Sequence, residues 1–236
     1  MDVNLVRHNF ADGEELAEAL AEAVGSDLAA AIKARGNAVL AVSGGVTPKR
    51  FLIELGRRAV DWSKVMVTLV DDRWVEATDE RSNERLVREN LLCGRAAAAS
   101  FTGLHVDVES PEQGLDEVRR KIASLSLPFD AAVIGMGADG HTASYFPGGD
   151  ALAEAINPVG KHLVVALRAE GANEPRITLT LPVLLAARSL YLHIEGAGRA
   201  RVLEAALGDG PIEEMPIRAV LRNVVRPLAV YYAPQG

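Results

Sequence analysis

A carboxylate and a histidine stand close together in the glycine-rich stretch GMGADGH, with Asp139 and His141 separated by Gly140. In such an arrangement one imidazole nitrogen can hold a hydrogen bond to the carboxylate while the other takes a proton from water. A lone histidine is more often a hydrogen-bonded structural residue, but the flanking glycines indicate that something approaches closely here. We therefore predict that His141 is a general base oriented by Asp139.

The same stretch matches the dinucleotide fingerprint G-x-G-x-x-G at Gly135, Gly137 and Gly140. A true fingerprint opens a long helix that holds a pyrophosphate, and an acidic residue follows about 20 positions later. Here the sequence FPGG at 146–149 would break such a helix almost at once. We interpret the match as accidental and expect no cofactor. No second histidine or cysteine stands at ligand spacing from His141, so we expect no metal either.

A second candidate site is the sequence SGGVTP, which begins at Ser43 and follows an apolar run. Gly44 and Gly45 let the backbone approach a ligand, and the pattern predicts Thr47 as the N-cap of a helix whose first residue is Pro48. Free amides at the positive end of a helix would bind an anion. A tight turn that binds nothing explains the same residues equally well.

The third candidate is Asp71-Asp72-Arg73, at the end of another apolar run. Charges at such a position are costly unless they are paired or meet a ligand. A structural ion pair between Arg73 and either aspartate is one interpretation, and for the aspartates it is at least as good as a catalytic role. The planar fork of donors on Arg73 favours contact with a phosphate or carboxylate.

These polar segments follow short apolar runs that must position them. The runs cover residues 38–42, 65–70, 131–135, 163–167, 177–181, 190–194 and 228–232. Their continuous apolarity is typical of strands covered on both faces and predicts a three-layer α/β fold, with a largely parallel sheet and helices on both faces. Ligands bind such sheets outside the carboxyl ends of the strands.

Helix start signals support this alternation of strands and helices. Asp12 and Glu15 form a capping-box pattern and predict a helix over 13–35. Ser110 followed by Pro111 predicts another helix start.

Length and composition narrow the function classes. The chain has 236 residues, is 49% hydrophobic and carries a net charge of −7, so we expect residues 1–236 to form a single domain. The absence of a Lys/Arg stripe argues against nucleic acid or an anionic membrane as partner. One cysteine, Cys93, and no signal peptide or membrane-length apolar run predict a cytoplasmic protein. We expect a monomer or weak homodimer.

Four segments in this order resemble the 6-phosphogluconolactonases, and the resemblance covers nearly the whole chain. The segments are SGGVTP, DDRWVEATDERSNERLVRENLL, GMGADGHTASYFPG and PRITLTLPVLLAAR. The resemblance implies a Rossmann-like fold of the sugar-phosphate isomerase/lactonase type. It also implies hydrolysis of 6-phospho-D-glucono-1,5-lactone to 6-phospho-D-gluconate, the second step of the oxidative pentose phosphate pathway.

The related glucosamine-6-phosphate deaminases share the D-G-H core but usually continue D-G-H-I-A-F-N-E-P. This chain instead reads TASYFP over 142–147, as the lactonases do, and Arg73 stands where the deaminases have tyrosine. The glutamate of the deaminase element has no counterpart. Two alternatives stay open, a deaminase/isomerase-like enzyme and a non-catalytic sugar-phosphate sensor.

The residues and the resemblance together imply a substrate-binding set. Its members are Ser43, Gly44, Gly45, Thr47, Arg73, Asn83, Gly137, Arg176 and Arg199. Arg176 and Arg199 would be charge partners of the phosphate, although Arg199 stands where the family commonly has lysine. The backbone N–H groups of Gly137 or its neighbours would stabilise the oxyanion. The remaining histidines stand isolated in terminal or strand-like segments and receive no role: His8, His105, His162 and His193.

Overall fold

The computed structural model describes residues 4–235, and its centre is a seven-stranded sheet in which every neighbouring pair is parallel. In spatial order the strands are β1 (Leu5–Asn9), β10 (Leu228–Ala233), β9 (Ser189–Glu195), β6 (Ala131–Ile134), β2 (Ala38–Val42), β3 (Val65–Leu69) and β5 (Ser100–Thr102). The prediction of a largely parallel α/β sheet is confirmed. The short strands β1 and β5 were not expected, because neither is a continuous apolar run.

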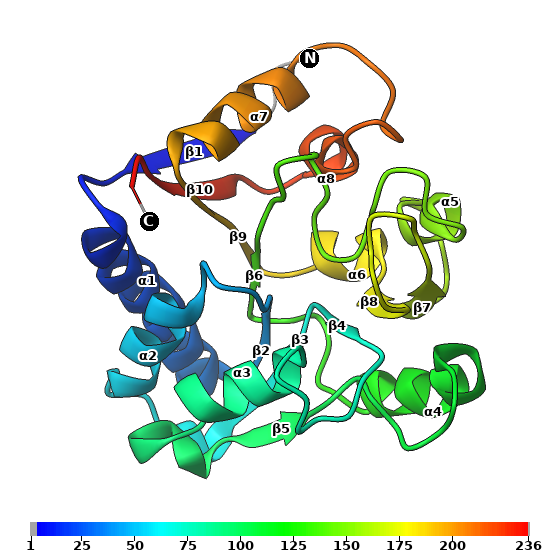
Figure 1. Ribbon diagram of the computed structural model, residues 1–236. Helices are drawn as coiled ribbons and strands as arrows, with labels where there is room; N and C mark the ends of the chain where they lie inside the picture. The colour runs from blue at the N-terminus through cyan, green and yellow to red at the C-terminus, as the bar shows by residue number, and fades with distance from the viewer. Residues whose placement is uncertain (1–3, 236) are drawn as a thin grey trace.

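Helices cover both faces of this sheet (Figure 1). They are α1 (Gly13–Arg35), α2 (Lys49–Arg57), α3 (Asn83–Asn90), α4 (Pro111–Ala123), α5 (Leu152–Ala155), α6 (Leu181–Leu185), α7 (Ala197–Leu207) and α8 (Ile217–Asn223), with 3-10 turns at Trp62–Lys64 and Gly94–Ala98. The helix α1 packs against β2, β6 and β10 and against α2, while α6 and α8 lie on the other side of the sheet.

Two predicted strands do not join the parallel sheet. The runs 163–167 and 177–181 form most of β7 (Val164–Leu167) and β8 (Arg176–Leu179), which pair antiparallel with each other and with β4 (Asp71–Arg73) in a separate three-stranded sheet. Apolar runs report burial but not the pairing partner. The connection between β7 and β8 contains no crossover helix, so the chain reverses and the strands pair antiparallel.

The predicted helix starts are correct in two cases and wrong in one. Asp12 accepts hydrogen bonds from the amides at the start of α1, and Ser110 caps α4 with Pro111 in its first turn. The helix α2 begins one residue later than expected, with Pro48 at the N-cap position and no side-chain cap. Thr47 therefore is not the N-cap, because it belongs to the turn before the helix, where the amide of residue 49 bonds the carbonyl of Val46.

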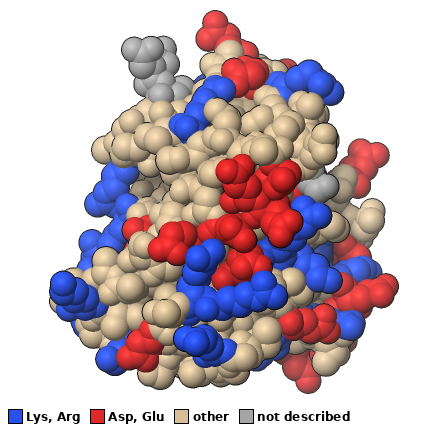
Figure 2. Space-filling view, turned by 90° about the vertical axis from the view of Figure 1, so that its left-hand side faces the viewer, with Lys and Arg blue, Asp and Glu red and all other residues tan. Residues whose placement is uncertain are grey.

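Within the described residues, no helix combines the length and apolarity required to span a membrane. Figure 2 shows basic and acidic side chains interspersed over one face of the molecule, without a continuous stripe of Lys and Arg on that face. The electrostatic field over this face is therefore of mixed sign.

Candidate active site

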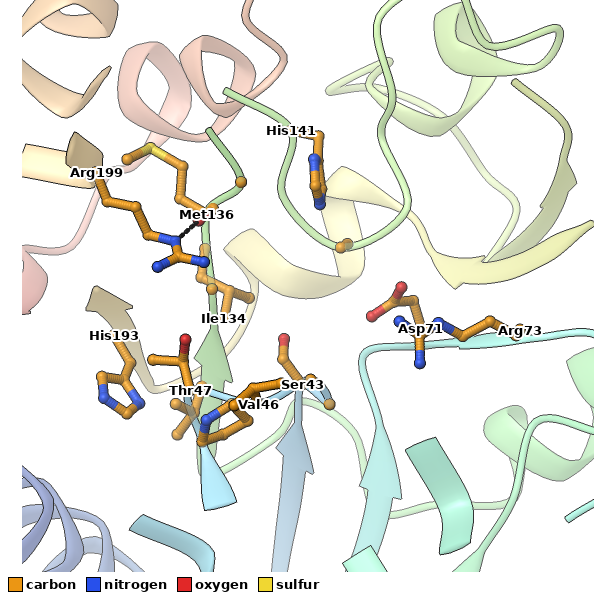
Figure 3. A pocket seen from close by; sticks show the side chains of 17 residues that line it. Ser43, Val46, Thr47, Asp71, Arg73, Ile134, Met136, His141, His193 and Arg199 are labelled. Carbon is orange, nitrogen blue, oxygen red and sulfur yellow. Dashed lines mark hydrogen bonds between the residues drawn. The ribbon is translucent and has the colours of Figure 1, made fainter. Parts of the chain in front are cut away.

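The carboxyl ends of β2, β3, β6 and β9 surround a cavity of about 200 Å³ (Figure 3). The cavity is lined by Ser43, Gly44, Gly45, Val46, Thr47, Pro48, Asp71, Arg73, Val133, Ile134, Gly135, Met136, Gly137, His141, Ala143, His193 and Arg199. Most of these residues follow the strands whose ends sequence reasoning singled out. The chemistry-bearing segments thus meet at one edge of the parallel sheet, where ligands of such folds bind.

His141 projects into the cavity from the loop after β6 (Figure 3). Its Nδ1 lies 2.5 Å from Oδ1 of Asp139, which also accepts the backbone amide of His141 at 3.1 Å. Partial burial raises the pKa of Asp139, but the hydrogen bonds from His141 outweigh it and hold this pKa below its usual value. The ionised carboxylate favours the tautomer with the proton on Nδ1, which leaves the lone pair of Nε2 to accept a proton.

The lack of a side chain at Gly137 leaves room for the His141 ring. A Cβ at position 137 would lie 2.2 Å from two atoms of this ring and 2.7 Å from Oδ1 of Asp139, so only glycine fits. The amide of Gly137 donates to the carbonyl of His141 at 2.9 Å and closes the loop. This donor is therefore already in use, which argues against the expected role of the Gly137 amide at the oxyanion.

The helix that a dinucleotide fingerprint requires does not follow these glycines. Residues 141–149, all described, form turns and one isolated bridge, and the next helix, α5, is only 4 residues long. The match to the fingerprint is accidental, and the glycines serve the His141 loop instead.

The turn after β2 forms the opposite wall of the cavity. Gly45 has φ of 102°, a backbone conformation that favours glycine. A Cβ on Gly44 would lie 1.9 Å from Oδ1 of Asn83, so the glycine allows this amide side chain to support the turn. Ser43 Oγ is buried and has no hydrogen-bond partner among residues 4–235. The wall thus presents an unsatisfied polar atom, and Thr47 also lines the cavity.

Asp71 and Arg73 form a third wall of the cavity, and Asp72 holds together the backbone segments behind it. Its carboxylate accepts the backbone amides of Arg73 at 2.8 Å, Asn83 at 2.7 Å and Glu84 at 3.1 Å. Burial raises the pKa of Asp72 to about 7, although these hydrogen bonds oppose the rise. Asp72 therefore ties β4 to the first turn of α3.

The ion pair between Arg73 and an adjacent aspartate, one of the two interpretations of this segment, is not formed among the described residues. Nη1 of Arg73 donates instead to the carbonyl of Arg81 at 2.5 Å and to Oδ1 of Asn83 at 3.2 Å. The carbonyl of Arg81 and the side-chain oxygen of Asn83 lie within hydrogen-bond distance of the guanidinium. The carboxylate of Asp72, on the same short strand as Arg73, already accepts backbone amides. Arg73 lines the cavity with its guanidinium held by neutral acceptors.

Asp71 connects this wall to the His141 loop. Its Oδ2 accepts the hydroxyl of the fully buried Ser144 at 2.5 Å. Between Ser144 and the histidine loop, Ala143 adopts φ of 50°, a left-handed conformation that is rare outside glycine and costs free energy. The strained turn lets His141 face the cavity while Ser144 is anchored below it.

The two predicted phosphate arginines lie in different places. Arg199, in the first turn of α7, lines the cavity and donates to the carbonyls of Met136 and Glu195, each at 3.1 Å. Arg176 is buried on β8 and is not a lining residue. Its guanidinium lies 5.3 Å from the Phe146 ring, which in turn packs 4.4 Å from the His141 ring. Arg176 thus supports the histidine from behind the wall.

Sequence reasoning missed His193. This residue of β9 lines the cavity, and its Nε2 lies 2.9 Å from Oε1 of Glu195. Residues two apart on a strand share a face, so the alternation L-H-I-E held the signal of a second histidine–carboxylate pair.

Comparison with known proteins identifies the family. A sequence model of the glucosamine-6-phosphate isomerases/6-phosphogluconolactonase family matches residues 11–227. A 6-phosphogluconolactonase of Rhizobium meliloti is 52% identical over 227 residues, which cover 96% of this chain and 98% of the relative. A 6-phosphogluconolactonase from Shewanella baltica, 41% identical, superimposes with a TM-score of 0.94 over 97% of both chains. By these matches the chain belongs to the family of glucosamine-6-phosphate isomerases and 6-phosphogluconolactonases.

Proposed function

We propose that this protein hydrolyses 6-phospho-D-glucono-1,5-lactone to 6-phospho-D-gluconate, with His141 as the general base. The observation that carries the proposal is the Asp139–His141 pair, whose Nε2 is left as acceptor beside a cavity that also holds arginines. Relatives of 52% and 44% identity bear the name 6-phosphogluconolactonase, which supports an ester hydrolase of this kind. The steps below use only side chains and water.

In the first step Nε2 of His141 takes a proton from water, and the oxygen attacks the lactone carbonyl carbon. The tetrahedral adduct then collapses, the bond from the former carbonyl carbon to the ring oxygen breaks, and the imidazolium returns its proton to that oxygen. Asp139 stabilises the imidazolium between these steps. The proton balance closes within one turnover, so a single histidine serves as both base and acid.

Binding groups on two walls would hold the lactone for this attack. The turn from Ser43 to Thr47 and the start of α2 offer backbone amides to the phosphate, and Arg199 adds positive charge. Arg73, on the other side of the cavity, would contact the sugar end of the substrate. Arg176 contributes by supporting Phe146 and the His141 ring rather than by contact with the substrate.

The deaminase alternative has less support from the cavity. Opening and isomerising an amino sugar requires further acid/base groups, yet Asp71 is the only carboxylate among the lining residues, and its Oδ2 is bonded to Ser144. A non-catalytic sensor would not need a histidine whose acceptor nitrogen faces the cavity, so this geometry does not support the sensor alternative.

A coupled assay tests the proposal. Lactone generated by glucose-6-phosphate dehydrogenase should disappear faster with the protein than without it, and glucosamine 6-phosphate should release no ammonia. Ammonia release without lactone turnover would establish the deaminase alternative, and neither activity together with tight sugar-phosphate binding would establish the sensor. A single domain over residues 1–236, a cytoplasmic location and a monomer or weak homodimer stay predictions, open to limited proteolysis, fractionation and light scattering.

A further inference from the structure

The cavity wall formed by β9 contains a buried polar atom that the proposed steps do not use. His193 is 3% exposed, and its Nδ1 has no hydrogen-bond partner among residues 4–235. Ser43 Oγ, in the same cavity, is also buried and unsatisfied. Buried polar atoms without partners are rare because their desolvation is not repaid. Nε of Arg73, another lining residue, is a third such atom. Three of them around one cavity indicate that a ligand supplies the missing hydrogen bonds.

The ring of His193 is fixed from two sides. Nε2 pairs with Oε1 of Glu195 at 2.9 Å, and the ring packs edge to face against Phe51, with 6.2 Å between ring centroids. Phe51 lies in the first turn of α2, directly after the turn that contains Thr47. These contacts leave Nδ1 as the one polar atom of the ring available to a ligand in the cavity.

The surroundings favour an anion at this position. Figure 3 shows His193 on the Thr47 side of the cavity, away from Asp71 and Arg73. In the sheet β9 and β3 are separated by β6 and β2, which puts about 14 Å between the strand of His193 and the one preceding Asp71. The Arg199 guanidinium and the N-terminal end of α2 supply positive potential on the His193 side.

We propose that His193 binds the phosphate group of the substrate through Nδ1, with Glu195 as the positioning residue that holds the ring. The proposal rests on the proposed function, because the ligand is the phosphorylated end of the lactone or of its product. One proton lies between Nδ1 of His193 and a phosphate oxygen. Either the imidazolium donates Nδ1–H to the phosphate dianion, or the neutral ring accepts a hydrogen bond at Nδ1 from the P–OH of the monoanion. His193 thus helps the site to distinguish a sugar phosphate from the free sugar acid.

Three substitutions separate this role from a structural one. An asparagine amide reproduces the position of Nδ1, a glutamine amide that of Nε2, and phenylalanine keeps the packing on Phe51 but neither polar group. His193→Asn should therefore retain affinity for phosphate, whereas His193→Gln and His193→Phe should lose it. The loss should be about 10- to 100-fold, as for one hydrogen bond to a charged group.

The measurement is titration calorimetry of wild type and variants with 6-phosphogluconate, inorganic phosphate and gluconate, and it does not depend on turnover. His193→Phe should weaken 6-phosphogluconate and phosphate but leave gluconate affinity unchanged. His162→Gln is the matched control, because His162 forms a similar pair with Glu154 on the surface, at 2.6 Å. Melting temperatures of all variants are measured alongside.

The outcomes are distinct. Equal affinities of His193→Phe and wild type for 6-phosphogluconate would overturn the proposal, and so would retained binding in His193→Gln with loss in His193→Asn, which indicates a structural need for the Glu195 contact. A parallel loss of gluconate affinity would also overturn it. If wild type binds 6-phosphogluconate in a His193-dependent way but turns over no lactone, the proposed function falls while this inference stands.

Discussion

Replacement of Gly137 by alanine tests how the histidine loop works. The added Cβ would lie 2.2 Å from Cε1 and Nδ1 of His141, and it would also meet Oδ1 of Asp139 at 2.7 Å. Ordinary contact begins near 3.4 Å, so the ring has to move by about 1.2 Å, and the movement breaks its bond to Asp139. Because the ring is part-exposed, it can move without unfolding the loop.

The expected result is a large loss of rate with little loss of stability. Misplacing a reacting group by about 1 Å costs about 10²-fold in rate, so kcat of Gly137→Ala at saturating lactone should fall by about that factor. Its melting temperature should stay near that of wild type, because no buried group loses a partner. The coupled lactone assay and a thermal melt measure the two quantities.

Gly171→Ala is the control, because Gly171 does not line the cavity and a Cβ there meets nothing within 4 Å. This variant should turn over lactone at the wild-type rate. Wild-type kcat in Gly137→Ala would refute the reasoning, and so would an equal loss of kcat in Gly171→Ala.

Three further predictions concern the supporting network. Gly44→Ala should raise KM about 10-fold, because its Cβ would lie 1.9 Å from Oδ1 of Asn83 and displace the support of the turn. Ser144→Ala should lower the free energy of unfolding by about 1–3 kcal/mol, since it removes the buried 2.5 Å bond to Asp71. Asp72→Asn should flatten the pH dependence of stability. Burial raises the folded-state pKa of Asp72 from 3.8 to about 7, so folding takes up a proton between these values and wild-type stability falls as pH rises through that window.

Each of these has its own check. Gly171→Ala, where a Cβ meets nothing within 4 Å, should keep the wild-type KM, and a normal KM in Gly44→Ala would contradict the clash. For Ser144→Ala, urea unfolding that matches wild type would show that the hydroxyl contributes nothing. For Asp72→Asn, unfolding is followed at several pH values, and a slope between pH 4 and pH 7 equal to that of wild type would assign the proton uptake to other groups.

Local patterns predicted the parts of the fold that depend on neighbouring residues. The helix over 13–35 followed from Asp12 and Glu15, whose side chains bond the chain at its start. The runs 163–167 and 177–181 were correctly expected to be strands for most of their length, but their sheet was wrong. Apolarity records that a strand is buried, whereas its partner depends on how the chain between strands returns.

The candidate site likewise contains a part that local sequence predicts and a part that depends on the three-dimensional arrangement. The Asp139–His141 pair is local, two residues apart, and the sequence alone placed it at a strand end. Arg176 and Arg199 were both predicted to be charge partners of the phosphate, but only the three-dimensional arrangement shows that Arg199 lines the cavity and Arg176 does not. His193 was passed over because its environment comes from α2 and the turn after β2, which are distant in sequence.

The most direct test of the central claim is the turnover of His141→Ala with 6-phospho-D-glucono-1,5-lactone, corrected for spontaneous hydrolysis. A positioned general base contributes about 10²- to 10⁴-fold, so kcat should fall by that factor while the variant stays folded and binds 6-phosphogluconate as wild type does. Turnover at the wild-type rate in a folded His141→Ala protein would contradict the assignment of His141 as the base.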